Sequence, residues 1–316
     1  MFMSQPNGAS KVETMADTAV LLMAYGTPDS TDEIEPYLTD IRRGRRPTPE
    51  ALEELKCRYL KIGGRSPLLE ITRAQASAVE KQLASRGVNT RVYVGMKHWH
   101  PYIREVTHRI VADGYNRIVG LVLAPHYSQM SIGGYKQALQ EALAASGRVN
   151  LEFIDSWYDH PLFHKAMKEK IEDKLTQFGE PERVELLFTA HSLPERIHAM
   201  NDPYPTQLAS SCRSVSSLLG RKAWSFAYQS AGQTEEKWLG PDLIDYLRNL
   251  QAADCSAAVL VVPIGFVADH LEILYDIDVE AQQFAQTIGV KVKRTESLNT
   301  SPTFISALTD IVSKWL

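Results

Sequence analysis

The sequence predicts an α/β protein made of two Rossmann-like domains, each a four-stranded parallel sheet flanked by helices. Short, continuous apolar runs alternate along the chain with segments whose apolar residues recur at helical spacing. This alternation is typical of parallel strands joined by helices. The two halves also repeat one another, since LMAYGTP at 22–28 aligns with FTAHSLP at 188–194. We therefore expect the domains to face each other across a cleft at the ends of their strands.

The first domain is expected to span residues 18–158. It follows a lead-in at 1–17, which we predict to be disordered because it lacks the basic and apolar regions of a secretory signal. The third strand of this domain ends at Pro125. Apolar runs and helical periodicity predict strands at 19–25, 90–96, 117–123 and 150–155, and helices at 32–41, 50–60, 70–86, 101–113 and 134–145.

The second domain is expected to span residues 159–300 and to open with a helix at 161–176. Its third strand ends at Pro263, in the place that matches the proline of the first half. The same criteria predict strands at 184–190, 224–228, 257–262 and 290–294. A last helix at about 302–315, within residues 301–316, is expected to pack back on the two domains.

Composition excludes several classes of protein. The chain has 316 residues, 44% of them hydrophobic and 23% charged, as in ordinary globular proteins. A net charge of −4 argues against a nucleic-acid partner, because general nucleic-acid binders are basic. No apolar run reaches the roughly 18 residues that a membrane span needs. Three distant cysteines without a CxxC pair predict neither disulfides nor a cluster site, and we expect a cytoplasmic protein.

An acidic stripe follows the predicted strand at 257–262. Glu272, Asp276 and Glu280 stand at i, i+4 and i+8, so on an α-helix they share one face, and each like-charge pair costs roughly 0.2–0.5 kcal/mol. A solvated helix face would explain the pattern equally well. The position of the stripe after a buried strand, where ligands bind in open α/β sheets, instead favours a site for a divalent cation with oxygen ligands.

His191 and Tyr25 occupy matching places after the first strand of each half, and His126 follows the third strand of the first half. An imidazole opposite carboxylates, without cysteine, suits Fe²⁺, Co²⁺, Ni²⁺ or Zn²⁺. The same groups also suit proton abstraction near pH 7. A histidine that is merely packed in the structure is the alternative interpretation.

Two loops of the first half have the composition of anion-binding loops. Residues 42–46 contain four arginines around Gly44 and could anchor the carboxylates or phosphates of a ligand, although a plain surface loop remains possible. The segment KIGGRSP at 61–67 is Gly-rich but matches neither a P-loop nor a dinucleotide-binding motif, so it is weak evidence alone.

Eight segments together resemble the ferrochelatase family, in particular its water-soluble, coproporphyrin-type members. The resemblance runs from about Ala19 to the C-terminus, and it implies a chelatase-type fold that inserts Fe²⁺ into a porphyrin bound between the domains. The segments are MAYGTP (23–28), IRRGR (41–45), RYLKIGGRSPL (58–68), PHYS (125–128), TAHSLPERI (189–197), DPYPTQL (202–208), WLGPD (238–242) and VPIGFVADHLEILYDID (262–278).

The resemblance also implies a role for individual residues. His191 and Glu272 match the metal-binding, catalytic pair on one face of the porphyrin, and Tyr25 matches a tyrosine that coordinates iron from the other face. Further metal-binding positions match an acidic track at Asp276 and Glu280. The positions that contact the porphyrin match Arg42, Arg58, Tyr59, Ser66 and Tyr135.

The resemblance implies coproporphyrin III as the substrate, because relatives that use protoporphyrin IX commonly have an Asn-Leu or Asn-Met segment in place of Ala24-Tyr25. One departure is Ala231, at a position that is often acidic in relatives. No organic cofactor is expected, since Fe²⁺ is itself a substrate, and we expect a monomer that hands its product to a transient partner.

Three alternatives remain open from the sequence. A protoporphyrin IX ferrochelatase and a cobalt or nickel chelatase share the fold and the chemistry, but the latter usually has two histidines at the metal. A carrier that holds heme or a metal between two lobes would perform no chemistry.

Overall fold

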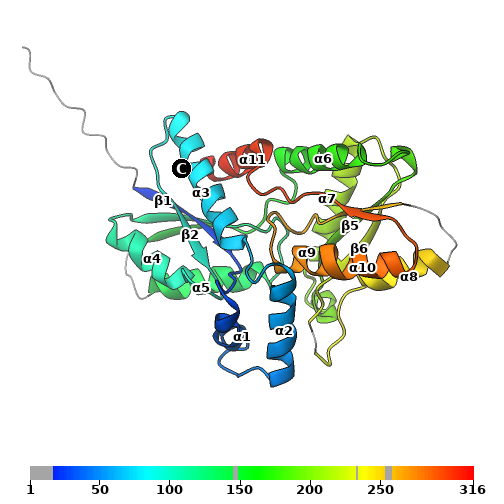
Figure 1. Ribbon diagram of the computed structural model, residues 1–316. Helices are drawn as coiled ribbons and strands as arrows, with labels where there is room; N and C mark the ends of the chain where they lie inside the picture. The colour runs from blue at the N-terminus through cyan, green and yellow to red at the C-terminus, as the bar shows by residue number, and fades with distance from the viewer. Residues whose placement is uncertain (1–16, 145–148, 233, 253–257) are drawn as a thin grey trace, which may run out of the picture.

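The computed structural model describes residues 17–144, 149–232, 234–252 and 258–316 of the chain. Figure 1 shows two lobes, each built around one sheet, with their helices outside. The lead-in expected at 1–17 lies almost wholly outside the described residues. No helix in the described part of the chain is long and apolar enough to cross a membrane.

The N-terminal sheet has the strand order β2-β1-β3-β4, and all of its pairs are parallel. Its central strand β1 is buried at every residue, as a continuous apolar run requires in a sheet covered on both faces. The strands are β1 (Thr18–Ala24), β2 (Val92–Met96), β3 (Arg117–Val122) and β4 (Asn150–Ile154). The helices are α1 (Ile34–Ile41), α2 (Pro49–Lys61), α3 (Leu68–Ser85), α4 (Ile103–Ala112) and α5 (Ile132–Ala144).

The C-terminal sheet repeats this topology with the order β6-β5-β7-β8, again all parallel. The predicted fold class of two four-stranded parallel sheets is therefore confirmed. The strands are β5 (Glu185–His191), β6 (Ser225–Gln229), β7 (Val259–Val262) and β8 (Val292–Arg294). The helices are α6 (Pro161–Leu175), α7 (Tyr204–Leu218), α8 (Leu243–Ala252), α9 (Leu271–Leu274) and α10 (Gln282–Thr287). The sequence analysis assigned no helix to α7, which is rich in serine, a weak helix former, or to α8.

The acidic segment departs from the expected continuous α-helix. Between α9 and α10 lies a π-helix, Asp276–Ala281, in which the Tyr275 carbonyl accepts hydrogen bonds from the amides of Val279 (3.0 Å) and Glu280 (2.9 Å). A π-turn is wider than an α-turn, and such turns are frequent at functional sites. Residues four apart therefore do not stack on one face here, and the predicted register of the stripe is wrong beyond its first turn.

The last helix, α11 (Pro302–Ser313), lies against α3 of the N-terminal lobe and α6 of the C-terminal lobe (Figure 1). Gln82 on α3 donates to Ser306 (3.0 Å) and accepts from Thr309 (2.7 Å). One apolar cluster continues across this contact, with Val20, Phe163, Phe188 and Phe304 among its fully buried members. The two sheets are thus joined on one side, and α2 reaches between them on another (Figure 1).

Gly265 allows the loop after β7 to close against β5. A Cβ at this position would lie 2.6 Å from Ala190 Cβ and 3.0 Å from Ala190 Cα, and the Gly265 amide donates to the Thr189 carbonyl at 3.2 Å. The side chain at 265 is excluded by strand backbone, which cannot move without displacing His191 at the strand end.

We predict that Gly265→Ala destabilises the protein by about 1–3 kcal/mol, the usual range for overpacking a filled core. Gly179→Ala is the matched control, because nothing lies within 4 Å of a Cβ there. Thermal unfolding followed by circular dichroism measures both variants. Equal melting temperatures would show that the loop after β7 adjusts freely to the added methyl group.

Candidate active site

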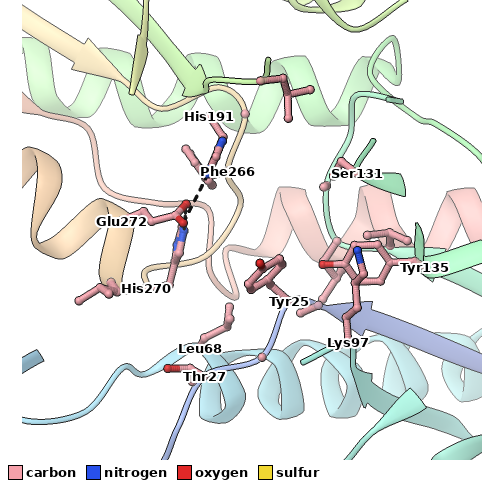
Figure 2. A pocket seen from close by; sticks show the side chains of 18 of the residues that line it. Tyr25, Thr27, Leu68, Lys97, Ser131, Tyr135, His191, Phe266, His270 and Glu272 are labelled. Carbon is pink, nitrogen blue, oxygen red and sulfur yellow. Dashed lines mark ion pairs between the residues drawn. The ribbon is translucent and has the colours of Figure 1, made fainter. Parts of the chain in front are cut away.

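A cavity of about 530 Å³ opens between the carboxyl ends of the two sheets. This is the edge at which doubly wound sheets bind ligands, and the volume is in the range of small-molecule sites. Residues from both halves line it, as the repeat predicts, including Tyr25, His126, His191 and Glu272. Figure 2 shows the two walls: one carries His191, Glu272 and His270, and the other carries Lys97, Ser131 and Tyr135, with Tyr25 between them.

His191 is the last residue of β5, so the strand end projects its imidazole into the cavity. Its Nδ1 bonds the Ser192 carbonyl, and its Nε2 lies 3.6 Å from Glu272 Oε1. A carbonyl oxygen can only accept a hydrogen bond, so Nδ1 carries a hydrogen and donates it, and Nε2 is the nitrogen that can gain or lose a proton. Burial lowers the pKa of His191, but the Glu272 carboxylate outweighs it and raises the pKa to about 9.

Glu272 lies in the first turn of α9, with its carboxylate held between two imidazoles. His270 Nε2 is 3.5 Å from Oε2, on the side opposite His191, and His270 Nδ1 bonds the Ala268 carbonyl at 2.9 Å. Burial raises the pKa of Glu272, but His191 and then His270 hold it well below its usual range. The pair therefore rests as an imidazolium and a carboxylate. The sequence analysis missed His270, although it stands two residues before Glu272.

Tyr25 extends from the end of β1 toward this pair (Figure 2). Its side chain is 41% exposed, and it lines the cavity. The ring packs 4.7 Å from that of His98, whose Nδ1 is 2.8 Å from Asp40 Oδ2. Burial, followed by the charges of Glu272 and Asp40, raises the pKa of Tyr25 well above its usual value. The phenol is therefore protonated in the free protein.

Three of the predicted porphyrin contacts line the cavity: Tyr59, Ser66 and Tyr135. The Tyr59 hydroxyl is 2.7 Å from that of Thr27, which fixes its direction. Ser66 Oγ accepts from the Leu68 amide at 3.4 Å, at the start of α3.

The two predicted arginine contacts are not part of the cavity lining. Arg42 is exposed at the end of α1. Arg58 pairs with Glu54 at 2.7 Å and with Asp276 at 3.6 Å, and it lies over the Tyr275 ring. Both lie on the helices that follow β1, outside the inner surface of the cleft.

The predicted metal-binding residues lie at successive depths. Asp276 is buried behind Glu272, where the Ser230 hydroxyl donates to its Oδ2 while its Oδ1 has no hydrogen-bond partner. Burial, followed by the charge of Glu272, raises the pKa of Asp276 to about 7. Glu280 is exposed at the surface. Among the residues that the structure describes, no three histidine, cysteine or acidic side chains converge to hold one metal ion.

Two parallel sheets of identical order, facing each other across an imidazole–carboxylate pair, define a chelatase-type protein. Solved structures agree on the fold. The sirohydrochlorin chelatase SirB from Bacillus subtilis subspecies spizizenii, in complex with cobalt, superposes with a TM-score of 0.55 over 94% of both chains at 10% identity. SirB from Bacillus subtilis with Fe³⁺ gives 0.58 over 94% of both chains at 11% identity.

The chain belongs to the ferrochelatase family, enzymes of metal insertion, because the model of that family matches residues 17–316. A ferrochelatase of Herpetosiphon aurantiacus is 45% identical over 94% of this chain and 99% of its own. The coproporphyrin III ferrochelatase of Geobacillus kaustophilus is 44% identical over 93% and 95%. That of Bacillus subtilis is 40% identical over 94% and 97%.

The raised pKa of Asp276 predicts that the stability of the protein depends on pH. In the unfolded chain its carboxyl titrates near 3.8, but in the folded protein near 7, so between these values the folded state binds more protons. Its contribution to stability therefore falls as the pH rises through this window and stays lost above it. We expect Asp276→Asn to melt close to the wild type at pH 5, but roughly 2 °C or more above it at pH 8.

Thermal unfolding of both proteins across pH 5–8 measures this difference. Gln286→Ala, an exposed change on α10 that removes no charge, is the control and should differ from the wild type by the same amount at every pH. A difference between Asp276→Asn and the wild type that is constant over the range would contradict the burial of an ionisable Asp276.

Proposed function

We propose that this enzyme inserts Fe²⁺ into coproporphyrin III and so forms coproheme in the cytoplasmic pathway of heme synthesis. The observation that carries the proposal is the His191–Glu272 pair, which faces Tyr25 across a cleft in a chain of the ferrochelatase family. The names of the relatives from Geobacillus kaustophilus and Bacillus subtilis support coproporphyrin III as the porphyrin.

The reaction joins one Fe²⁺ and one porphyrin and releases two protons from the pyrrole nitrogens. The protein must therefore deliver a dication and accept protons at the same face of a flat ring. Glu272 is ionised beside His191, so it attracts the iron, and His191 Nε2 points into the space where the ring would lie. A positioned general base of this kind typically accelerates proton transfer by about 10²–10⁴-fold.

The arrival of iron can itself produce the base. The Glu272 carboxylate raises the pKa of His191 to about 9, so without iron the imidazole is protonated. The resulting imidazolium is itself a cation and repels another one. When Fe²⁺ approaches Glu272, it offsets this negative charge, and the pKa of His191 falls. The imidazolium would then give its Nε2 proton to water, and the free Nε2 could accept a pyrrole proton and pass it to water in turn, once for each of the two protons released. Proton removal is thereby coupled to the presence of the metal.

Glu280, Asp276 and Glu272 support a route for the metal from the surface to the cavity, because they lie exposed, buried and cavity-lining in that order. Asp276 Oδ1 accepts no hydrogen bond and lies 3.6 Å from Arg58 Nη1, so a passing cation would have to displace this arginine to reach it. The rim at Arg42, Arg58 and Ser66 offers cations and a hydroxyl to the four carboxylates of coproporphyrin.

A direct assay tests the proposal. The purified enzyme is incubated anaerobically with Fe²⁺ and either coproporphyrin III or protoporphyrin IX, and the change in absorbance on metalation is followed. We expect faster insertion into coproporphyrin III. Insertion into protoporphyrin IX alone would reassign the substrate, and porphyrin binding without metalation would indicate a carrier.

Loss of either member of the pair should abolish the chemistry. We predict that His191→Ala and Glu272→Gln each lower kcat by at least about 10²-fold while the protein still binds the metal-free porphyrin, measured by quenching of protein fluorescence. His164→Ala is a control outside the cavity. Turnover close to that of the wild type in His191→Ala would remove this imidazole from the mechanism.

Tyr25 should act on the product more than on insertion. A phenolate oxygen is a hard donor and prefers Fe³⁺ to Fe²⁺, so it should hold the oxidised product. We predict that Tyr25→Phe, which removes only the hydroxyl, retains insertion but loses the tyrosinate-type absorbance of bound ferric product and releases it faster. An unchanged product spectrum would assign Tyr25 a packing role only.

A further inference from the structure

Arg294 is the last residue of β8, and its side chain joins the two ends of the segment that carries Glu272. Its Nε and Nη2 donate to the two carboxylate oxygens of Asp278 at 2.8 and 2.7 Å, in the forked arrangement of the strongest arginine–carboxylate pairs. Its Nη1 lies 3.3 Å from Asp269 Oδ1. Asp269 precedes Glu272 and Asp278 follows it, so one guanidinium holds the segment at both ends.

Asp269 is fixed by further hydrogen bonds from the segment that follows β8. Its Oδ1 accepts from Ser297 Oγ at 2.7 Å, its Oδ2 accepts from Asn299 Nδ2 at 2.8 Å, and its amide donates to Asn299 Oδ1 at 2.9 Å. The Asn299 carbonyl in turn accepts from Gln75 Nε2 of α3 at 2.8 Å. The same network therefore ties the segment before Glu272 to the N-terminal lobe.

The charges of this network are largely withdrawn from water. The side chains of Arg294, Asp269 and Asp278 are 11%, 22% and 34% exposed. Burial lowers the pKa of Arg294, but Asp278 and then Asp269 outweigh it and raise the pKa, so the guanidinium stays charged. A buried ion pair adds little stability compared with apolar side chains of the same shape, because desolvation opposes the attraction. What it provides here is a defined geometry.

The helix that carries Glu272 does not fix this geometry by itself. α9 has only four residues and passes into the π-turn at 276–281, so no continuous α-helix sets the direction of the side chain. Ile273 and Ile277 are buried in the core of the lobe, but apolar contact is not directional. A forked guanidinium–carboxylate pair is directional, so Arg294 can fix what packing leaves free.

We propose that Arg294 is a positioning residue that sets where the Glu272 carboxylate lies relative to His191. It is not part of the cavity lining, and it acts only through the two aspartates that it joins. The inference rests on the proposed function, because it takes Glu272 to be the carboxylate that receives the metal. Glu272 Oε1 lies 3.6 Å from His191 Nε2, and a displacement of about 1 Å at such a contact can lower the rate about 10²-fold.

Arg294→Met tests the proposal, because methionine keeps much of the apolar stem and removes the guanidinium. With the porphyrin that the wild type metalates, we expect kcat for Fe²⁺ insertion to fall roughly 10–100-fold and the KM for Fe²⁺ to rise. The Kd for the metal-free porphyrin should change less than about twofold, since Arg294 lies outside the cavity. Rates are measured at a temperature at which circular dichroism shows each variant to be folded.

Arg221→Met is the matched control. Arg221 is also a partly buried arginine of the C-terminal lobe, but it donates to the carbonyls of Val184 and Pro181, at the opposite end of β5 from His191. It should lower the melting temperature, as Arg294→Met does, and leave kcat close to that of the wild type. An equal loss of kcat in both variants would show that the loss follows from stability, and would overturn the proposal.

A double variant separates positioning from other effects on the rate. In Glu272→Gln no carboxylate remains to be positioned, so adding Arg294→Met should lower the rate no further, measured in single turnovers with excess enzyme. The same fold loss in both backgrounds would contradict an action through Glu272. Arg294→Lys, which keeps the charge without the fork, is the second variant should Arg294→Met fold poorly, and it should show smaller losses of the same kind.

The outcomes distinguish this inference from the proposed function. If Glu272→Gln is inactive while a folded Arg294→Met or Arg294→Lys inserts iron at the wild-type rate, the inference about Arg294 alone is overturned. If Glu272→Gln itself turns over like the wild type, the proposed function falls, and this inference with it.

Discussion

The negative charge of Glu272 is the interaction on which the site depends. Its carboxylate is shared between His191 and His270, and its charge raises the pKa of Tyr25 across the cleft and of Asp276 behind it. One group therefore raises the pKa of His191 and adds to the effect of burial on Tyr25 and Asp276. Such coupling is strong because the cleft is partly closed to water, where charges act over longer distances than in solvent. A neutral side chain at this position would alter all three groups together.

The duplicated topology explains how residues so distant in sequence come to face one another. Tyr25 directly follows the central strand β1, His191 is the last residue of the central strand β5, and the identical order of strands turns both edges toward the same space. Gly265 lets the loop that leads to Glu272 approach β5 closely. His191 is thus held by strand backbone, and Glu272 is held by the first turn of α9 after a loop that packs on the same strand, so the two side chains keep a fixed separation.

The strands and the residues that end them could be predicted, because a buried parallel strand has a recognisable sequence pattern, a short run of apolar residues. Tyr25, His191 and Glu272 follow such runs, and the structure brings them together. The π-turn at 276–281, the pairing of His270 and the burial of Asp276 could not be predicted in this way. Each depends on which backbone and side-chain groups meet after folding, and a helical stripe of carboxylates looks the same whether it faces solvent or protein.

The two walls of the cavity differ in charge. The wall of His191 and Glu272 compensates its own charges by pairing an imidazolium with a carboxylate. The wall of Lys97 has positive charge in excess, beside the start of α5. The carboxylate of Glu272 therefore favours a dication at one wall, and the ammonium of Lys97 favours an anionic group at the other. The ferrochelatase family inserts a metal into a porphyrin, and a cavity whose two walls differ in charge can receive a dication and an acidic ring from different sides.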